Sequence, residues 1–208
     1  MLDWLETRDS LVLKAFVSIL AGTFFHPKAK MAEASGPTSK HPAFLTHDWG
    51  VDRSNHKRVV RVAKNLQQRG LPVWIDETEM AGHIMQKISD GIESSDVIVV
   101  FITRCYLDKV GGSDVSDNCK LEFNYASRKS KPMIPVVMEE QVRDNHAWNG
   151  PVGIFLGGHL YVKMWDDEDI DGEGLERLIE QIIKRTPAWS GLVTEAPTTP
   201  TLAEPVQW

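Results

Sequence analysis

The sequence predicts an α/β protein with a flavodoxin-like, doubly wound sheet of five parallel strands, in the order 2-1-3-4-5, and helices on both faces. From residue 42 onward, short apolar runs alternate with amphipathic segments, which is typical of βαβ units. Residues 97–102 are an unbroken run of Val, Ile and Phe, as a central strand covered on both faces requires. The composition, 42% hydrophobic and 25% charged, provides enough apolar residues for one sizeable core.

Local patterns predict the individual elements. Strands are expected at residues 43–46, 71–75, 97–102, 133–138 and 160–164. Residues 141–159 contain too many glycines and too little periodicity for a long element, so a loop with one short helix is expected. Helices are expected from a cap at Ser54 or Asn55 to Gly70, over the spacing of Ile84, Ile88 and Ile92, from a cap at Asp117 or Asn118 to Arg128, and over residues 175–183.

Both ends of the chain differ in character from its centre. Residues 1–40 are predicted to be an N-terminal extension, residues 41–187 the folded domain, and the Pro/Thr-rich residues 188–208 a disordered tail. Residues 11–25 are mostly apolar but too short to span a membrane comfortably. The acidic residues before them disagree with a secretory signal or a transit peptide. An amphipathic helix that contacts a membrane is a possible alternative, but it is not favoured.

Charge and cysteine content exclude several classes of function. The formal net charge of -6 provides no basic field for a nucleic-acid partner. Cys105 and Cys119 form no CxxC cluster, so neither a disulfide framework nor a zinc site is predicted, and reduced thiols suit a cytoplasmic protein. The seven histidines form no HExxH motif or close pair, and no metal site is predicted.

The predicted strand order also predicts where a ligand binds. In open parallel sheets, ligands occupy the crevice beyond the carboxyl ends of the strands where the order reverses. This crevice lies at the ends of the first and third predicted strands. The residues expected to converge there are His47, Asp48, Trp49, Thr103 and Arg104.

Glu122 is a carboxylate whose neighbours on the predicted helix are mostly not charged. Three and four residues away lie Cys119, Tyr125 and Ala126, which are mostly small or apolar. A carboxylate on the sheet-facing side would be partly desolvated and would need a positive or hydrogen-bonding partner. The alternative is a boundary glutamate whose carboxylate reaches solvent.

Several short motifs occur in order between residues 42 and 187. Ala-Phe-Leu-Thr at 43–46 is followed by Val-Trp-Ile-Asp at 73–76 and Met-Ala-Gly at 80–82, and Thr-Arg-Cys-Tyr at 103–106 precedes Cys-Lys-Leu-Glu at 119–122. In this order they resemble the motifs of the TIR (Toll/interleukin-1 receptor) family. The resemblance places the family's BB loop at residues 76–82. It also places Glu122 where catalytic members carry their active glutamate.

The resemblance implies cleavage of NAD+ at the bond between nicotinamide and ribose, with Glu122 as the catalytic residue. NAD+ is then a substrate and not a cofactor, and no GxGxxG motif of a dehydrogenase follows the first predicted strand. A single carboxylate is sufficient because nicotinamide leaves from a cationic pyridinium and needs no proton. The carboxylate can orient the ribose hydroxyls and stabilise the oxocarbenium-like charge.

Crevice position and the family motifs together select the expected substrate-binding residues. Trp49 could stack on a ring of the substrate and Asp48 could bind a ribose hydroxyl, but a structural tryptophan and a turn-capping aspartate are equally compatible with the sequence. Asn118 stands where many plant-type members carry tryptophan, and residues 47–50 replace a more basic segment. The expected substrate-binding residues are Thr46, His47, Asp48, Trp49, Asp76, Gly82, Arg104, Tyr106, Asn118 and Cys119.

The resemblance further implies homotypic self-association through the BB loop and the flanking helices, in signalling or defence. A non-catalytic adaptor that acts only through such TIR to TIR contacts is the alternative function. A phosphoreceiver has the same predicted sheet order, but its chemistry needs an aspartate at the end of the third strand, where this chain has Thr103.

Overall fold

A five-stranded parallel sheet forms the centre of the computed structural model, which describes residues 37–76 and 84–194. The strand order is β2-β1-β3-β4-β5, which confirms the predicted order 2-1-3-4-5. Both edge strands pair over only two residues, so they are shorter than the apolar runs that predict them. The strands are β1 (His41–His47), β2 (Trp74–Ile75), β3 (Ser95–Ile102), β4 (Met133–Val137) and β5 (Val162–Lys163).

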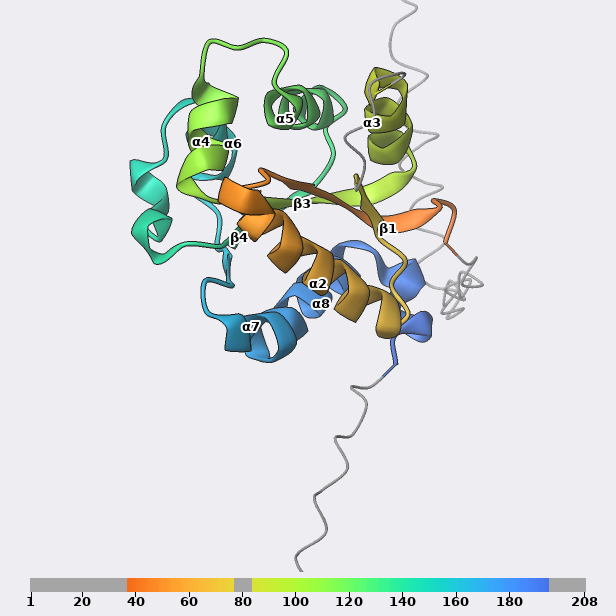
Figure 1. The fold of residues 1–208 in the computed structure, drawn as a ribbon. Helices are drawn as coiled ribbons and strands as arrows, with labels where there is room; N and C mark the ends of the chain where they lie inside the picture. The colour runs from red at the N-terminus through yellow and green to blue at the C-terminus, as the bar shows by residue number, and fades with distance from the viewer. Residues whose placement is uncertain (1–36, 77–83, 195–208) are drawn as a thin grey trace, which may run out of the picture. The chain divides into compact units, whose positions relative to one another are not determined.

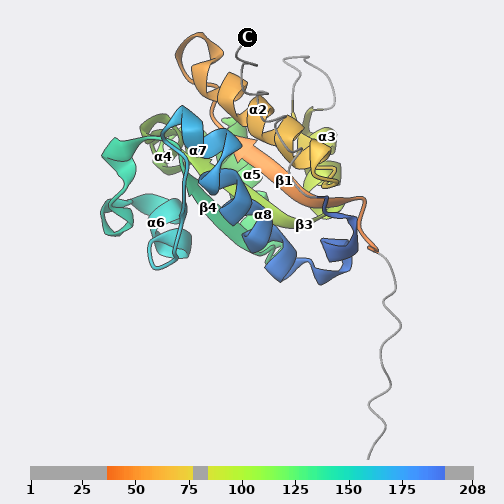
Figure 2. The same ribbon diagram turned by 90° about the horizontal axis from the view of Figure 1, so that it is seen from below.

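Helices cover both faces of this sheet, as predicted. In Figure 1, α2 (Ser54–Gln68), α7 (Asp167–Asp171) and α8 (Glu173–Arg185) lie below the sheet, and Figure 2 shows the same layer from below. The opposite layer consists of α3 (Ile84–Glu93), α4 (Arg104–Gly111), α5 (Asn118–Arg128) and α6 (Gly150–Leu156). Short 3-10 helices complete the described fold: η1 (Val51–Arg53), η2 (Glu140–Val142), η3 (Asn145–Ala147) and η4 (Pro187–Leu192).

The central strand β3 contributes to both layers because its side chains alternate. Val97, Val99 and Phe101 pack into the core shared with α2 and α8. The intervening Ile98, Val100 and Ile102 pack into the core shared with α3, α4, α5 and α6. Each of these six side chains is at most 1% exposed. The unbroken apolar run therefore reflects burial on both faces of a parallel sheet.

The start of α2 differs from the prediction of a Ser54 or Asn55 cap. Its N-cap is Arg53, in the left-handed region at φ 58°, and no side chain caps the helix. Ser54 is already helical, because η1 leads directly into α2. The Asn55 amide instead donates to the backbone oxygen of Asp48, at 2.9 Å, and so joins the helix to the end of β1. This hydrogen bond of Asn55 cannot be recognised from the local sequence pattern.

The start of α5 confirms Asp117, one of the two predicted caps, whereas Asn118 is the first residue of the helix. The Asp117 carboxylate accepts hydrogen bonds from the backbone N–H groups of Cys119, at 2.9 Å, and Lys120, at 3.3 Å. The helix ends at Arg128, as predicted. Two helices, α4 and α7, were not predicted, because each is too short to show more than about two turns of periodicity.

The prediction of disorder from residue 188 is wrong for the first part of that segment. Helix η4 runs over Pro187–Leu192, and Trp189 is 5% exposed within the core shared with α2 and α8. The Trp189 Nε1–H donates to Asp96 Oδ2 at 2.9 Å, and Ser39 donates to the same oxygen at 2.6 Å. Composition alone cannot show such contacts with residues distant in the sequence.

Some predictions concern residues outside the described ranges. They include the extension up to residue 36 with its apolar stretch 11–25, the BB-loop residues 77–82, and residues 195–208. In the described part of the chain, no helix combines the length and apolarity needed to cross a bilayer.

Replacing Trp189 tests whether η4 belongs to the cooperative fold. We expect Trp189→Ala to lower the free energy of unfolding by about 3–5 kcal/mol, because it removes a buried indole. Leu192→Ala on the same 3-10 helix is the matched control, because Leu192 is 50% exposed and its loss costs under about 1 kcal/mol. Urea unfolding followed by circular dichroism measures both. Equal urea midpoints for the two variants would contradict the assignment of η4 to the cooperative fold.

Candidate active site

A cavity of about 420 Å³ opens beyond the carboxyl ends of β1 and β2, against α4 and α5. Ligands are expected beyond the carboxyl ends of parallel strands, and the cavity lies there. The predicted position between the first and third strands is wrong, because the cavity lies at β1 and β2 and neither Thr103 nor Arg104 lines it. The described residues that line it are Leu45, His47, Trp49, Asp76, Lys109, Ser116, Asp117, Asn118, Cys119 and Glu122.

Glu122 lies on the second turn of α5 and reaches the wall of this cavity. The residue is only 7% exposed, so the alternative of a carboxylate in open solvent is wrong. Its Oε2 accepts a hydrogen bond from Thr46 Oγ1 at 2.6 Å. The Tyr106 hydroxyl lies 3.1 Å from the same Thr46 oxygen. Thr46 and Tyr106 are fully buried and lie behind Glu122, outside the cavity lining.

The surroundings of Glu122 change its affinity for a proton. Burial raises its pKa to about 8, because a charged carboxylate loses hydration there. The hydrogen bond from Thr46 opposes this rise, whereas the negative charges of Asp76 and Asp117 add to it and Lys109 opposes it. Such a perturbed carboxyl group in a cavity is typical of functional sites.

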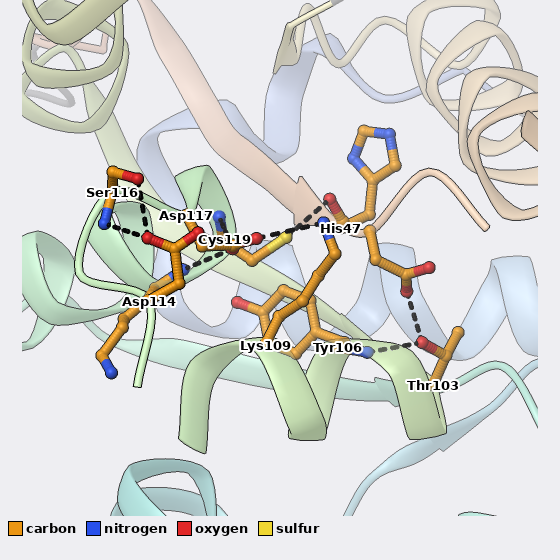
Figure 3. A network of polar contacts seen from close by, with 10 residues as sticks. His47, Thr103, Tyr106, Lys109, Asp114, Ser116, Asp117 and Cys119 are labelled. Carbon is orange, nitrogen blue, oxygen red and sulfur yellow. Dashed lines mark hydrogen bonds and ion pairs between the residues drawn. The ribbon is translucent and has the colours of Figure 1, made fainter. Parts of the chain in front are cut away.

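An ion pair between Lys109 and Asp117 joins α4 to the start of α5 (Figure 3). The Lys109 Nζ lies 3.1 Å from Asp117 Oδ2, and both residues line the cavity. The nearby Ser116 hydroxyl donates to Asp114 Oδ1 at 2.7 Å. Lys109 and Ser116 are lining residues that no sequence motif indicates. The spacing of Tyr106 and Lys109, three residues apart, would place them on one side of α4, but that helix was not predicted.

His47 and Cys119 form another part of the wall. The His47 Nε2 and His56 Nδ1 atoms lie 2.8 Å apart. Burial, and then the proximity of His56, lower the pKa of His47 to about 4, so this ring is neutral at pH 7. The Cys119 thiol donates to the backbone oxygen of His47 at 3.5 Å (Figure 3), and burial raises the pKa of this thiol. Both groups are therefore neutral lining groups.

Trp49 lines the cavity while it packs on neighbouring side chains. Its ring centroid lies 4.9 Å from that of His56, and the Arg53 guanidinium lies 4.8 Å from the indole centroid. The half-buried indole therefore combines a structural role with a position on the cavity wall.

The structure does not bring every predicted site residue to the cavity. Asp48 is 1% exposed and accepts hydrogen bonds from Thr103 Oγ1 and, at 3.2 Å, from Asn55 Nδ2. It fastens β1 to α2 and α4 and is not part of the lining. Arg104 faces a separate hollow of about 280 Å³. Gly82 lies outside the described residues.

Half of the predicted substrate-binding residues do meet at this cavity, whereas Thr46 and Tyr106 lie behind Glu122. Five of the expected substrate-binding residues line it together with Glu122: His47, Trp49, Asp76, Asn118 and Cys119. Within the described ranges, no group of three or more His, Cys, Asp or Glu side chains is placed to hold a metal ion.

Solved structures that are similar to this chain include an enzyme and a receptor domain. The CMP N-glycosidase BcmB of Clostridium botulinum is 19% identical, with a TM-score of 0.43, over 67% of this chain and 98% of that one. The TIR domain of the Toll-related receptor TRR-2 of Hydra magnipapillata is 16% identical, with a TM-score of 0.44, over 68% of this chain and 98% of that one.

A search of curated proteins finds no match. A family model described as a TIR domain matches residues 44–179, which include the whole sheet except the start of β1 and nearly all of the cavity-lining elements. The match covers more than half of the chain, and the chain therefore belongs to the TIR-domain family.

Proposed function

We propose that this TIR domain is an NAD+ glycohydrolase that cleaves the bond between nicotinamide and ribose, with Glu122 as the catalytic carboxylate. One observation carries the proposal. A nearly buried carboxyl group reaches the wall of a cavity of about 420 Å³, held by a hydrogen bond from Thr46. The cavity volume falls within the range of about 300–1,000 Å³ that is usual for small-molecule sites.

The charge of the cavity supports a cationic substrate ring. Among its described lining residues, Asp76, Asp117 and Glu122 are acidic and Lys109 is basic. Asp117 is already engaged in capping α5 and in the ion pair with Lys109. Acidic groups outnumber the one basic group among the described lining residues, and when Glu122 is ionised this excess attracts the positively charged nicotinamide ring and repels a phosphate monoester. We therefore assign the nicotinamide end of NAD+ to the cavity.

The proposed chemistry requires little of the protein beyond one well-placed carboxylate. The bond between ribose C1′ and the pyridinium nitrogen breaks, and its electron pair neutralises the leaving nicotinamide. The Glu122 carboxylate stabilises the positive charge that develops on the ribose. Water then adds to C1′, and Glu122 can accept the proton that this water loses. No second acid is needed, because the leaving group departs as a neutral molecule.

Replacing Glu122 tests the catalytic assignment. We expect Glu122→Gln and Glu122→Ala to reduce nicotinamide release from NAD+ by about 100-fold or more, the usual effect of losing one transition-state contact. Glu180→Gln on the exposed face of α8 is the matched control and should retain wild-type activity. Chromatographic assay of nicotinamide measures each rate. Equal rates in all four proteins would exclude Glu122 as the catalytic residue, whereas no activity in any of them would favour the adaptor function.

The same residue predicts a pH dependence of stability. Glu122 holds its proton more tightly in the folded protein, with a pKa of about 8, than at its ordinary value of 4.5. The contribution of Glu122 to the free energy of unfolding is therefore full below about pH 4.5, and it is lost as the pH rises through 8. The loss amounts to at most about 1.4 kcal/mol per pH unit.

Glu122→Gln removes this proton equilibrium and keeps the shape of the side chain. We expect the variant to gain stability relative to the wild type between pH 5 and pH 8, as followed by urea unfolding at both values. A constant difference between the two proteins across this range would show that Glu122 is not a buried acid.

Self-association is the second part of the proposed function. It would bring copies together through the BB loop and its flanking helices. Met85, on the first turn of α3 and next to that loop in sequence, is 52% exposed despite its apolar side chain. Such a residue is suited to a contact between copies.

Light scattering over a range of protein concentrations, with and without NAD+, tests self-association. We expect concentration-dependent oligomers that Met85→Glu weakens. Leu160→Glu, at a 98% exposed site between α6 and β5, is the control and should leave them unchanged. A monomer at every concentration would count against activation by assembly.

A further inference from the structure

A buried line of three side chains leads from α4 through β1 to Glu122. The Thr46 Oγ1 atom lies 2.6 Å from Glu122 Oε2 and 3.1 Å from the Tyr106 hydroxyl oxygen. Thr46 and Tyr106 are 0% exposed, and Glu122 is 7% exposed. Hydrogen bonds in such an interior have no competition from water, so their loss has a larger effect than at a surface.

The order of donors in this line follows from the chemistry of the groups. When Glu122 is ionised, its carboxylate only accepts hydrogen bonds, so Thr46 then uses its one O–H to donate to Glu122. The Thr46 oxygen can then accept, and the Tyr106 O–H is the donor that faces it. Burial, the largest influence, raises the pKa of Tyr106, so this phenol keeps its proton at any pH at which the protein works.

The fold positions the two hydroxyl groups through one shared anchor. Thr46 is the sixth residue of β1, and Asp48 follows just after the end of that strand. The Asp48 carboxylate accepts a hydrogen bond from Thr103. Thr103 also caps α4 by accepting from the backbone N–H of Tyr106 at 2.9 Å (Figure 3). Asp48 thus fastens the start of α4, and with it Tyr106, to the strand that carries Thr46.

The two oxygens of Glu122 are placed differently. Oε2 accepts from Thr46, whereas no hydrogen bond joins Oε1 to another residue in the described ranges. Because Glu122 lines the cavity, an oxygen held away from Thr46 is available to a bound ligand.

We propose that Tyr106 and Thr46 are positioning residues that hold Glu122 Oε2, orient Oε1 toward the substrate and stabilise the ionised carboxylate against the cost of its burial. This inference rests on the proposed function for its catalytic part. The hydrogen-bond relay itself is independent of the substrate.

A carboxyl titration tests the relay without any assay of activity. The side-chain carboxyl carbon of Glu122 is followed by NMR against pH in the full chain, in wild type, Thr46→Val, Thr46→Ser and Tyr106→Phe. We expect Thr46→Val to raise the pKa of Glu122 by about one pH unit or more, because a hydrogen bond to the charged form is lost. Thr46→Ser should restore the wild-type value, and Tyr106→Phe should give a smaller rise.

Thr186→Val is the matched control for the loss of a buried hydroxyl. Thr186 is 4% exposed, and its Oγ1 donates to the Ile182 backbone oxygen at 2.9 Å, at the end of α8. This variant should lose some thermal stability but leave the pKa of Glu122 unchanged. An unchanged pKa in Thr46→Val as well would overturn the relay.

Nicotinamide release then separates the relay from the proposed function. We expect Thr46→Val to lower kcat by about 10-fold or more with little change in KM, and to move the acidic limb of the kcat/KM profile to higher pH. Thr46→Ser should retain both parameters. Wild-type kcat and pH profile in Thr46→Val would overturn the positioning role. A shifted pKa together with no activity in the wild type would leave the relay standing and reject the glycohydrolase.

Discussion

Burial of β3 on both faces is the constraint on which the arrangement of this TIR domain depends. Its six apolar residues, 97–102, cannot remain covered unless a layer of helices packs on each side of the sheet. The layer that contains α4 and α5 brings Lys109, Asp117 and Glu122 to the carboxyl end of β1. The cavity is thus a consequence of where the layer of helices ends.

Much of this arrangement could be predicted from the sequence because it depends on periodicity. The strand order and a helix cap at Asp117 or Asn118 follow from short-range patterns of apolar and polar residues, but those patterns left open whether Glu122 is buried or reaches solvent. What could not be predicted depends on contacts between distant segments. Lys109 meets Asp117 only because α4 and α5 pack together, and Trp189 is buried only because Asp96 and the core beside α8 receive it.

Glu122 departs from the rule that carboxylates stay near solvent, as does Asp48, which is 1% exposed. Burial raises the pKa of Glu122 to about 8, and the single hydrogen bond from Thr46 does not compensate for the lost hydration. Residues that break such rules without a local gain in stability are commonly those that function requires. A buried carboxyl group with such a raised pKa, at the wall of a cavity, is typical of functional sites.

The shared acceptor Asp96 has a consequence for how this domain can be combined with others. Its Oδ2 accepts hydrogen bonds from Ser39, ahead of β1, and from Trp189, after α8. Both contacts lie at the amino-terminal ends of the strands. The described chain therefore enters and leaves the fold near the amino-terminal ends of the strands, whereas the cavity lies beyond their carboxyl ends. A partner joined directly to the described fold, near Ser39 or Trp189, would therefore be attached away from the cavity and leave its opening clear.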